Sequence, residues 1–166
     1  MAKGTPLQHI LVAVDFSETS DRARDYAFAL ARQAGASVEL LHVFQWPIYA
    51  GPLDTSEGPS ARLIEDLQKQ QEAALLQQER SSKDAQVHVR TTMRKGIPHE
   101  AIVQQAQKSQ ANLIVMGTRG RTGLSHALLG SVAERVVRTS PIPVLTVGDR
   151  AADELEAREP LERADA

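Results

Sequence analysis

Glycines recur at every third position in one stretch of the chain, at Gly117, Gly120 and Gly123, and a Gly-Ser pair follows at Gly130 and Ser131. Glycine lets the backbone approach a ligand closely, because it has no side chain to stand between them. If a helix begins at Gly130, the amides of Gly130, Ser131 and Val132 are predicted to be unpaired donors in its first turn, and the positive end of the helix dipole lies there. These groups suit an anion, so the segment predicts a site for a phosphate chain.

The same segment offers further partners for phosphate. Arg119 and Arg121 would place guanidinium groups in the loop, and Ser131 adds a hydroxyl. Each charge-assisted hydrogen bond contributes about 1.5 to 3 kcal/mol. Three or four such bonds, less the cost of ordering the ligand, would give micromolar affinity, about −8 kcal/mol. The alternative is a surface loop whose glycines bind nothing, which a Gly-Ser helix entry at a strand end disfavours.

Commoner motifs do not fit this segment. No lysine lies in the loop, which excludes GxxxxGK[ST], and GTRGRTG does not match GxGxxG. Ala127 stands where a nucleophile elbow requires its second glycine, so Ser125 is not predicted to be a nucleophile. Asp15 is the one candidate base for phosphoryl transfer, although an acid at a helix start has a structural use as well. We predict no catalytic residues; a slow ATPase or phosphoryl transferase and a scaffold without nucleotide stay open as alternatives.

Short apolar runs alternate with helical patterns along the chain, which is typical of an α/β protein. The spacing of apolar residues predicts helices over 17–35, 60–82, 98–110 and 130–137. The many glutamines of the second helix are predicted to form a solvated face. Strands are predicted at His9–Val14, Ser37–Val43, Gln86–Met93, 111–117 and Val144–Val147.

This order of elements predicts a single-domain, Rossmann-like α/β fold. The expected sheet is five-stranded and parallel, in the order 3-2-1-4-5, with helices on both faces. Ligands of such sheets bind beyond the carboxyl ends of the strands, where the strand order reverses. Asp15 ends the first strand and the glycine segment follows the fourth, so both would face the same crevice.

The composition fits one cytoplasmic domain. The chain has 166 residues, 42% of them hydrophobic, and no cysteine, which excludes disulfides and thiolate zinc sites and favours a reducing compartment. The apolar run before Asp15 is too short for a signal peptide or a membrane span. The whole chain has a net charge of −2 and residues 149–166 have −4, so residues 1–148 have a net charge of +2. This small positive charge suits binding of a nucleotide, but it is too small for a protein that binds nucleic acid. We expect the acidic tail to be a flexible appendage.

Three further features concern partners and metals. The strand Val144–Val147 would expose an apolar sheet edge, so we predict a homodimer in which a second copy covers it. The long loop Phe44–Ser60 could close over the crevice as a lid, or pack on a helix face or a dimer partner. The five histidines show no ligand spacing, so no protein metal site is predicted, and Mg²⁺ could arrive with the nucleotide.

The spacing of Gly117, Gly120 and Gly130-Ser131 is similar to GxxGx9G[ST], the ATP-binding signature of the universal stress protein family. The likeness extends over residues 1–148 and leaves 149–166 outside. It implies a Rossmann-like fold, homodimers through the last strand, and a regulatory stress-response protein that binds ATP with weak or no hydrolysis. By residue, it implies ribose and phosphate contacts at Gly117, Arg119, Gly120, Gly130, Ser131 and Val132, with Met116 beside the nucleotide, Asp15 near the ribose and the main chain of Val43 at the adenine edge.

Overall fold

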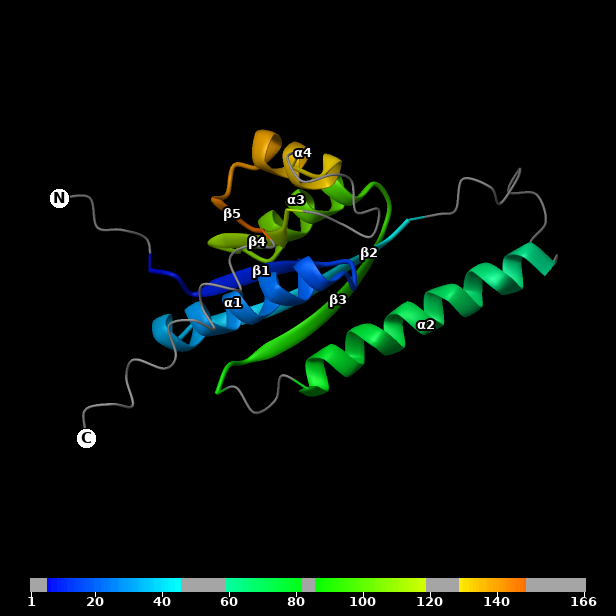
Figure 1. Ribbon diagram of the computed structural model, residues 1–166, viewed down its shortest axis with the longest axis horizontal. Coiled ribbons are helices and arrows are strands. Elements are labelled where there is room, and N and C mark those ends of the chain that lie inside the picture. The colour runs from blue at the N-terminus through cyan, green and yellow to red at the C-terminus, as the bar shows by residue number, and fades with distance from the viewer. Residues whose placement is uncertain (1–5, 46–58, 82–85, 119–128, 149–166) are drawn as a thin grey trace.

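The structure, a computed structural model, describes residues 6–45, 59–81, 86–118 and 129–148. In these ranges strands and helices alternate, in the order β1 (His9–Val14), α1 (Glu18–Ala34), β2 (Ser37–Phe44), α2 (Pro59–Ser81), β3 (Val89–Lys95), α3 (Pro98–Lys108), β4 (Leu113–Gly117), α4 (Ser131–Thr139) and β5 (Val144–Val147). The strands form one parallel sheet in the order β3-β2-β1-β4-β5. Helices α1 and α2 cover one face, and α3 and α4 cover the other (Figure 1). The predicted fold class and strand order are confirmed.

The ends of α1 follow from its sequence. Ser17 caps the start, since its Oγ accepts a hydrogen bond from the Ser20 amide at 3.3 Å. Gly35 ends the helix with a φ of 66°, a left-handed conformation that glycine adopts without steric cost. Both ends lie where the sequence predicted them.

The third strand begins later than predicted. Gln86 has a φ of 42°, so the chain turns there, and β3 starts at Val89. The strand then continues to Lys95, which pairs with Phe44 of β2. The alternation of apolar and polar residues runs on through the turn, which is why the predicted span Gln86–Met93 was wrong at its start.

Two partly buried glutamines of α2 bond to the protein. Gln71 Oε1 lies 2.7 Å from Nε2 of His42 in β2, and Gln78 donates an Nε2 hydrogen bond to Asp21 of α1 at 2.8 Å. Leu75 is buried in the core between them along the helix. The prediction of a solvated glutamine face is therefore wrong for these two residues, which tie α2 to the rest of the fold.

The central strands are buried on both faces. Ile10 and Val12 of β1 pack against the side of α1 and α2, while Leu11 and Ile114 pack against the side of α3 and α4. Burial of each such side chain contributes about 1.5 to 3 kcal/mol. This double burial explains the continuous apolar runs of the parallel strands. No helix in the described ranges combines the length and apolar character that a bilayer span needs.

The strand order reverses between β1 and β4. The chain leaves β1 for α1 on one face and leaves β4 for α4 on the other. In doubly wound sheets, ligands bind beyond the carboxyl ends of the two strands between which the order reverses. Asp15 and Gly117 stand at these two ends.

Candidate functional site

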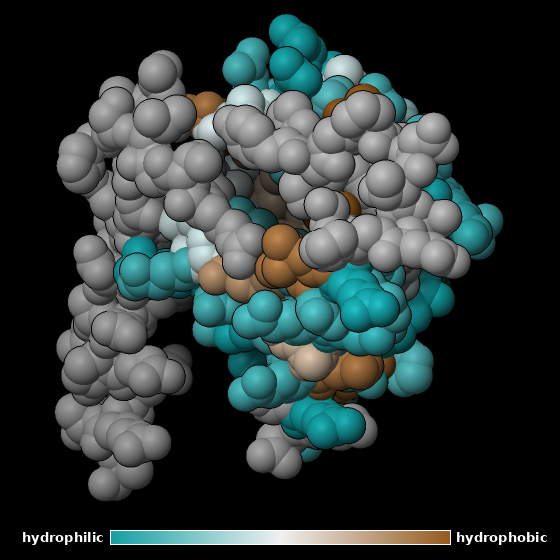
Figure 2. Space-filling model, turned by 90° about the vertical axis from the view of Figure 1, so that its right-hand side faces the viewer, coloured by the Kyte–Doolittle hydropathy of each residue, from teal (hydrophilic) through white to brown (hydrophobic). Residues whose placement is uncertain are grey.

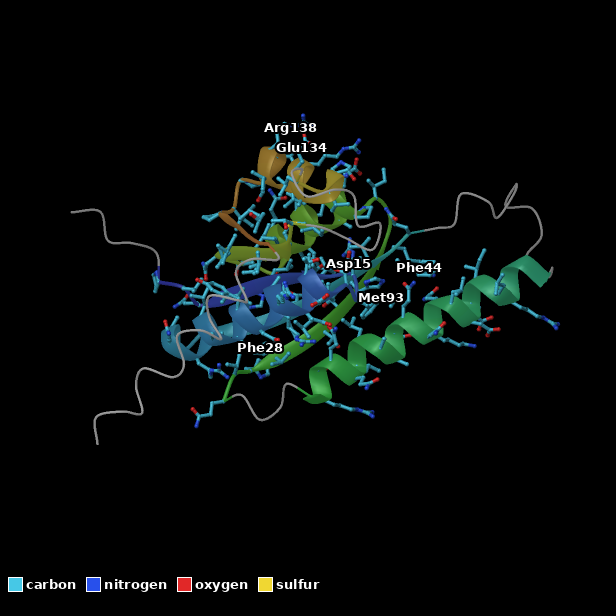
Figure 3. All side chains as sticks on the ribbon, in the orientation of Figure 1. Asp15, Phe28, Phe44, Met93, Glu134 and Arg138 are labelled. Carbon is cyan, nitrogen blue, oxygen red and sulfur yellow. The ribbon has the colours of Figure 1, made fainter. Side chains whose placement is uncertain are left out.

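Asp15 leaves the end of β1 and organises the start of α1. Its Oδ1 accepts hydrogen bonds from the Ser17 amide at 3.0 Å and the Ser17 hydroxyl at 2.5 Å, and its own amide donates to Ser20 Oγ at 3.1 Å. Asp15 therefore has a structural role, because it holds Ser17, the N-cap residue of α1, in place. Oδ2 has no hydrogen-bond partner among the described residues, so it is available to a ligand. Figure 3 shows Asp15 and Phe44 on the side of the molecule where β1 and β2 end.

His42 supports this turn from β2. The residue is 5% exposed, its Nδ1 lies 2.7 Å from the carbonyl oxygen of Val14, and its Nε2 lies 2.7 Å from Gln71 Oε1. The ring also packs against Phe16, with centroids 4.5 Å apart. Phe16 has a φ of 63°, a conformation that costs a residue with a side chain about 1 to 3 kcal/mol. The contacts of His42 thus help to hold the strained turn that presents Asp15.

Replacing His42 with alanine is expected to lower the free energy of unfolding by about 2 to 3 kcal/mol. The change leaves the buried Val14 carbonyl and the Gln71 side chain without their partner and removes a buried ring. Urea unfolding followed by circular dichroism measures the loss. His88→Ala is the matched control, because His88 is exposed, and its effect should stay below about 0.5 kcal/mol. Equal losses in the two variants would contradict the supporting role of His42.

Gly117 ends β4, where the strand packs against the first turn of α1. A Cβ atom at this position would lie 3.0 Å from the carbonyl carbon of Thr19 and 3.1 Å from the amide nitrogen of Ser20. Both atoms belong to the backbone of the first turn of α1, so the helix itself would have to shift. The glycine therefore has a packing role, whether or not it also contacts a ligand, and it brings the Asp15 turn close to the end of β4.

Replacing Gly117 with alanine is expected to cost about 1 to 3 kcal/mol of stability through overpacking against α1. Gly148→Ala is the matched control, because a Cβ there would lie 3.5 Å from Thr118 Oγ1, an ordinary contact distance. We expect the control to change stability by less than about 0.5 kcal/mol in thermal or urea unfolding. A Gly117→Ala protein as stable as the control would contradict the close approach of α1 and β4.

Gly130 is the N-cap of α4, with a φ of −59° and a ψ of 147°. Its amide donates a hydrogen bond of 2.7 Å to the carbonyl of Thr118, so the prediction that this amide is unpaired is wrong. The amides of Ser131 and Val132 have no hydrogen-bond partner among the described residues, and Ser131 is exposed. The amides that could donate hydrogen bonds to an anion are therefore those of Ser131 and Val132, and not the amide of Gly130.

Three of the predicted contact residues lie on the α3 and α4 side of the sheet. Met116 is buried in the core there, and Val43 and Val132 pack against that core while remaining partly exposed. All three approach the carboxyl edge from β4, β2 and α4. The structure thus brings together residues that are more than seventy positions apart in the chain.

A hollow of about 350 Å³ lies at the same edge. Its lining comes from the ends of β2 and β3 and the start of α3: Phe44, Gln45, Lys95, Gly96, Ile97 and Pro98. Ile97 is 53% exposed. Figure 2, which faces the side of the molecule where β2 ends, shows apolar atoms next to hydrophilic ones on this surface. The hollow begins one residue beyond Val43, and none of the predicted contact residues in the described ranges lines it.

Several predictions fall outside the described residues. Arg119 and Gly120 belong to this group, as do residues 46–58 of the predicted lid and the tail 149–166. Their predicted roles stay predictions. Within the described ranges no group of three or more histidine, aspartate or glutamate residues is arranged to hold a metal ion.

The strand order reverses between β1 and β4, and the first amides of α4 have no partner among the described residues. These features define a Rossmann-like α/β protein with its candidate site at the carboxyl edge of the sheet. Residues 6–148 match the model of the universal stress protein family, and the chain belongs to this family.

Individual relatives agree with this assignment. Universal stress protein MJ0531 of Methanocaldococcus jannaschii is 36% identical over 138 residues, which cover 83% of this chain and 80% of the relative. The solved structure of protein MJ0577 of the same organism has a TM-score of 0.76 at 31% identity and covers 87% of this chain and 97% of its own. A universal stress protein solved in complex with cAMP has a TM-score of 0.60 at 25% identity, over 87% of this chain and 98% of its own.

Proposed function

We propose that the protein binds an adenine nucleotide, ATP with Mg²⁺, in the opening between the ends of β1 and β4. The nucleotide would set the conformation or the partners of a dimer that acts in a stress response. Phosphates and ribose would contact the glycine segment and the start of α4, with Asp15 at the ribose and the main chain of Val43 at the adenine. The proposed contact set is Asp15, Val43, Met116, Gly117, Arg119, Gly120, Gly130, Ser131 and Val132.

The observation that carries the proposal is the open first turn of α4. The amides of Ser131 and Val132 have no partner among the described residues and stand at the positive end of the helix dipole. The bond from Gly130 to Thr118 fixes where these donors lie. At the end of the neighbouring strand, Asp15 Oδ2 offers an acceptor. A nucleotide carries both an anion for the amides and ribose hydroxyls for the carboxylate.

The similarity to a universal stress protein solved in complex with cAMP supports adenine as the base. Membership of the family supports a regulatory role and not a metabolic one. We place the protein in the cytoplasm, because a chain of 166 residues without cysteine suits a reducing compartment.

A slow ATPase is the second candidate, and the unpartnered Oδ2 of Asp15 is the observation that favours it. A carboxylate at this position could orient a water molecule toward a terminal phosphate. Turnover of ATP faster than about one per second, which is within the usual range of enzymes, would favour this alternative.

The experiment that tests nucleotide binding has two steps. Native mass spectrometry of the freshly purified protein should show a co-purified adenine nucleotide. Calorimetric titration of the nucleotide-free protein should then give a Kd for ATP in the micromolar range, about −8 kcal/mol. A protein that carries no nucleotide and gives no binding heat with ATP, ADP or AMP would refute the proposal.

We also propose a homodimer through β5, which pairs only with β4 in the described sheet. The carbonyls of Pro143 and Val147 accept hydrogen bonds from the amides of Ile114 and Thr118, at 2.9 Å each. Because hydrogen-bonding groups alternate along a strand, Thr146 directs its amide and carbonyl away from β4. A second copy of β5 could pair with this free edge about a twofold axis.

Replacing Thr146 with proline is expected to convert the dimer to a monomer. Proline removes an outward amide that the partner strand would need, and edge strands tolerate it without loss of the bonds to β4. Light scattering coupled to size-exclusion chromatography measures the mass of both proteins, with Thr146→Val as the control that keeps the amide. A monomeric wild type, or a Thr146→Pro protein that stays dimeric, would contradict the proposed interface.

A further inference from the structure

Glu39 forms a buried polar network away from the nucleotide opening. It pairs in register with Leu11 of β1, four residues or about 13 Å before Asp15 along the strand. Its side chain is fully buried, and both carboxylate oxygens have partners. Oε1 accepts from Thr92 Oγ1 and Gln105 Nε2 at 2.7 Å each, and Oε2 lies 2.7 Å from Arg90 Nη2 and 3.3 Å from His9 Nε2.

The network keeps this carboxylate charged. Burial by itself would raise the pKa of Glu39, but hydrogen bonds from His9, Thr92, Arg90 and Gln105 outweigh it and hold the pKa well below its ordinary value. Buried ion pairs add little net stability, because desolvation offsets their attraction, and apolar residues of similar volume often serve the fold as well. Buried charged groups with specific partners are common at functional sites. The space beside Glu39 is therefore a candidate for a binding site.

A cavity of about 320 Å³ opens beside the network, between β2, the edge strand β3 (Figure 1) and the end of α3. It is lined by Glu39, Arg90, Thr92, Gln105, Lys108 and Ser109. The volume is at the lower end of the range for small-molecule sites. It would therefore hold a metabolite-sized ligand and not a polymer.

The lining has more positive than negative charge. Glu39 is its one acid, and its oxygens are already occupied by protein donors. Arg90, whose side chain is 50% exposed, gives only Nη2 to the network, so Nη1 and Nε have no partner among the described residues. Lys108 is exposed and likewise has no hydrogen-bond or ion-pair partner in the described part of the chain. Glu39 thus orients Arg90, while Lys108 has no counter-ion within the described ranges.

We propose that this cavity is a second binding site, separate from the nucleotide opening, for a small organic anion that carries a carboxylate or phosphate group. Arg90 and Lys108 hold the anion, and Glu39 acts as a positioning residue that orients Arg90. Both bases present N–H donors to a ligand that neutralises the excess positive charge. The lining disfavours a cationic ligand, because both oxygens of its one carboxylate already accept hydrogen bonds from the protein.

Nuclear magnetic resonance of the full chain tests this site, with succinate and inorganic phosphate as two separate probes at constant ionic strength. We expect saturable shifts of the backbone amides of Thr92, Gln105, Lys108 and Ser109 with at least one probe. Shifts with succinate alone assign a carboxylate ligand, and shifts with phosphate alone assign a phosphorylated one. Binding of phosphate to the nucleotide opening would instead shift Ser131 and Val132, so the two sites are distinguished in one spectrum.

Lys108→Gln is expected to weaken binding at this cavity about tenfold, because it removes one charge-assisted hydrogen bond. Lys69→Gln is the matched control, since Lys69 is an exposed lysine on α2 that pairs with Glu65, and it should leave the affinity unchanged. No saturable shift at the four amides with either probe would overturn the proposal. Equal affinities in Lys108→Gln and the wild type would overturn it as well.

Discussion

Replacing Glu39 with alanine lowers the free energy of unfolding by about 3 kcal/mol at neutral pH. The change leaves the Thr92 hydroxyl and the Gln105 amide, which both donate to Oε1, without an acceptor. It also removes the counter-ion of Arg90, but this side chain is 50% exposed and can turn to water. The expected loss is therefore at the lower end of the range for a broken buried pair. Urea unfolding followed by circular dichroism measures it.

Glu134→Ala is the matched control for this prediction. Glu134 lies on α4 with its side chain 60% exposed, 3.9 Å from Arg138 (Figure 3). Exposed ion pairs of this kind contribute little, so its loss should change stability by less than about 0.5 kcal/mol. If Glu39→Ala were no more damaging than this control, the network around Glu39 would not hold the sheet and α3 together.

The Glu39 carboxylate also makes stability depend on pH. Its pKa in the folded protein lies below the ordinary value of 4.5, so the unfolded chain binds a proton first as the pH falls. The stabilising contribution is complete above about pH 4.5 and declines below it. Glu39→Gln lacks this group, and the stability difference between the two proteins should shrink from about pH 6 to about pH 3. A difference that stays constant over this interval would contradict the depressed pKa.

Replacing Gly130 with valine abolishes ATP binding, with at least a hundredfold loss of affinity, or about 2.7 kcal/mol. A branched side chain at the N-cap obstructs the close approach of phosphate to the amides of Ser131 and Val132. The φ of −59° and ψ of 147° at Gly130 are available to any residue, so the backbone of α4 need not change. Calorimetric titration with ATP measures the loss, and an unchanged circular dichroism spectrum shows that the fold persists.

Thr139→Val provides the control on the same helix. Thr139 is exposed at the carboxyl end of α4, far along the helix from Gly130, and valine has nearly the same shape. The control should bind ATP with wild-type affinity. Undiminished affinity in Gly130→Val would place the phosphates elsewhere, and an equal loss in Thr139→Val would point to general damage to α4.

The fold could be predicted from the sequence because its signals are local. The apolar runs at His9–Val14 and 111–117 mark doubly buried strands, and Gly35 marks a helix end by its backbone conformation. The start of β3 was missed, since a positive φ at Gln86 leaves no trace in the pattern of apolar residues. Likewise, the glutamine-rich sequence around Gln71 is typical of a solvated helix face. Its hydrogen bond with His42 could not be predicted, because the two residues are 29 positions apart in the chain.

The candidate site could be predicted only in part. Asp15 follows the end of β1, and α4 starts at Ser131, as predicted. Both positions follow from the order of strands and helices along the chain. The pairing of the Gly130 amide with Thr118 depends on how the chain returns from the loop, which spacing does not encode. The network of Glu39 joins β1, β2, β3 and α3. An acid inside the apolar run Ser37–Phe44 was the one sequence signal that could have indicated it.

The most direct test of nucleotide binding at the carboxyl edge is a titration of the isotope-labelled protein with ATP, followed amide by amide in nuclear magnetic resonance spectra. We predict saturating shifts at Ser131 and Val132 in α4 and at Asp15 and Gly117 at the strand ends, with a midpoint in the micromolar range. Spectra in which these four amides stay in place, while ATP shifts other residues or none, would contradict it.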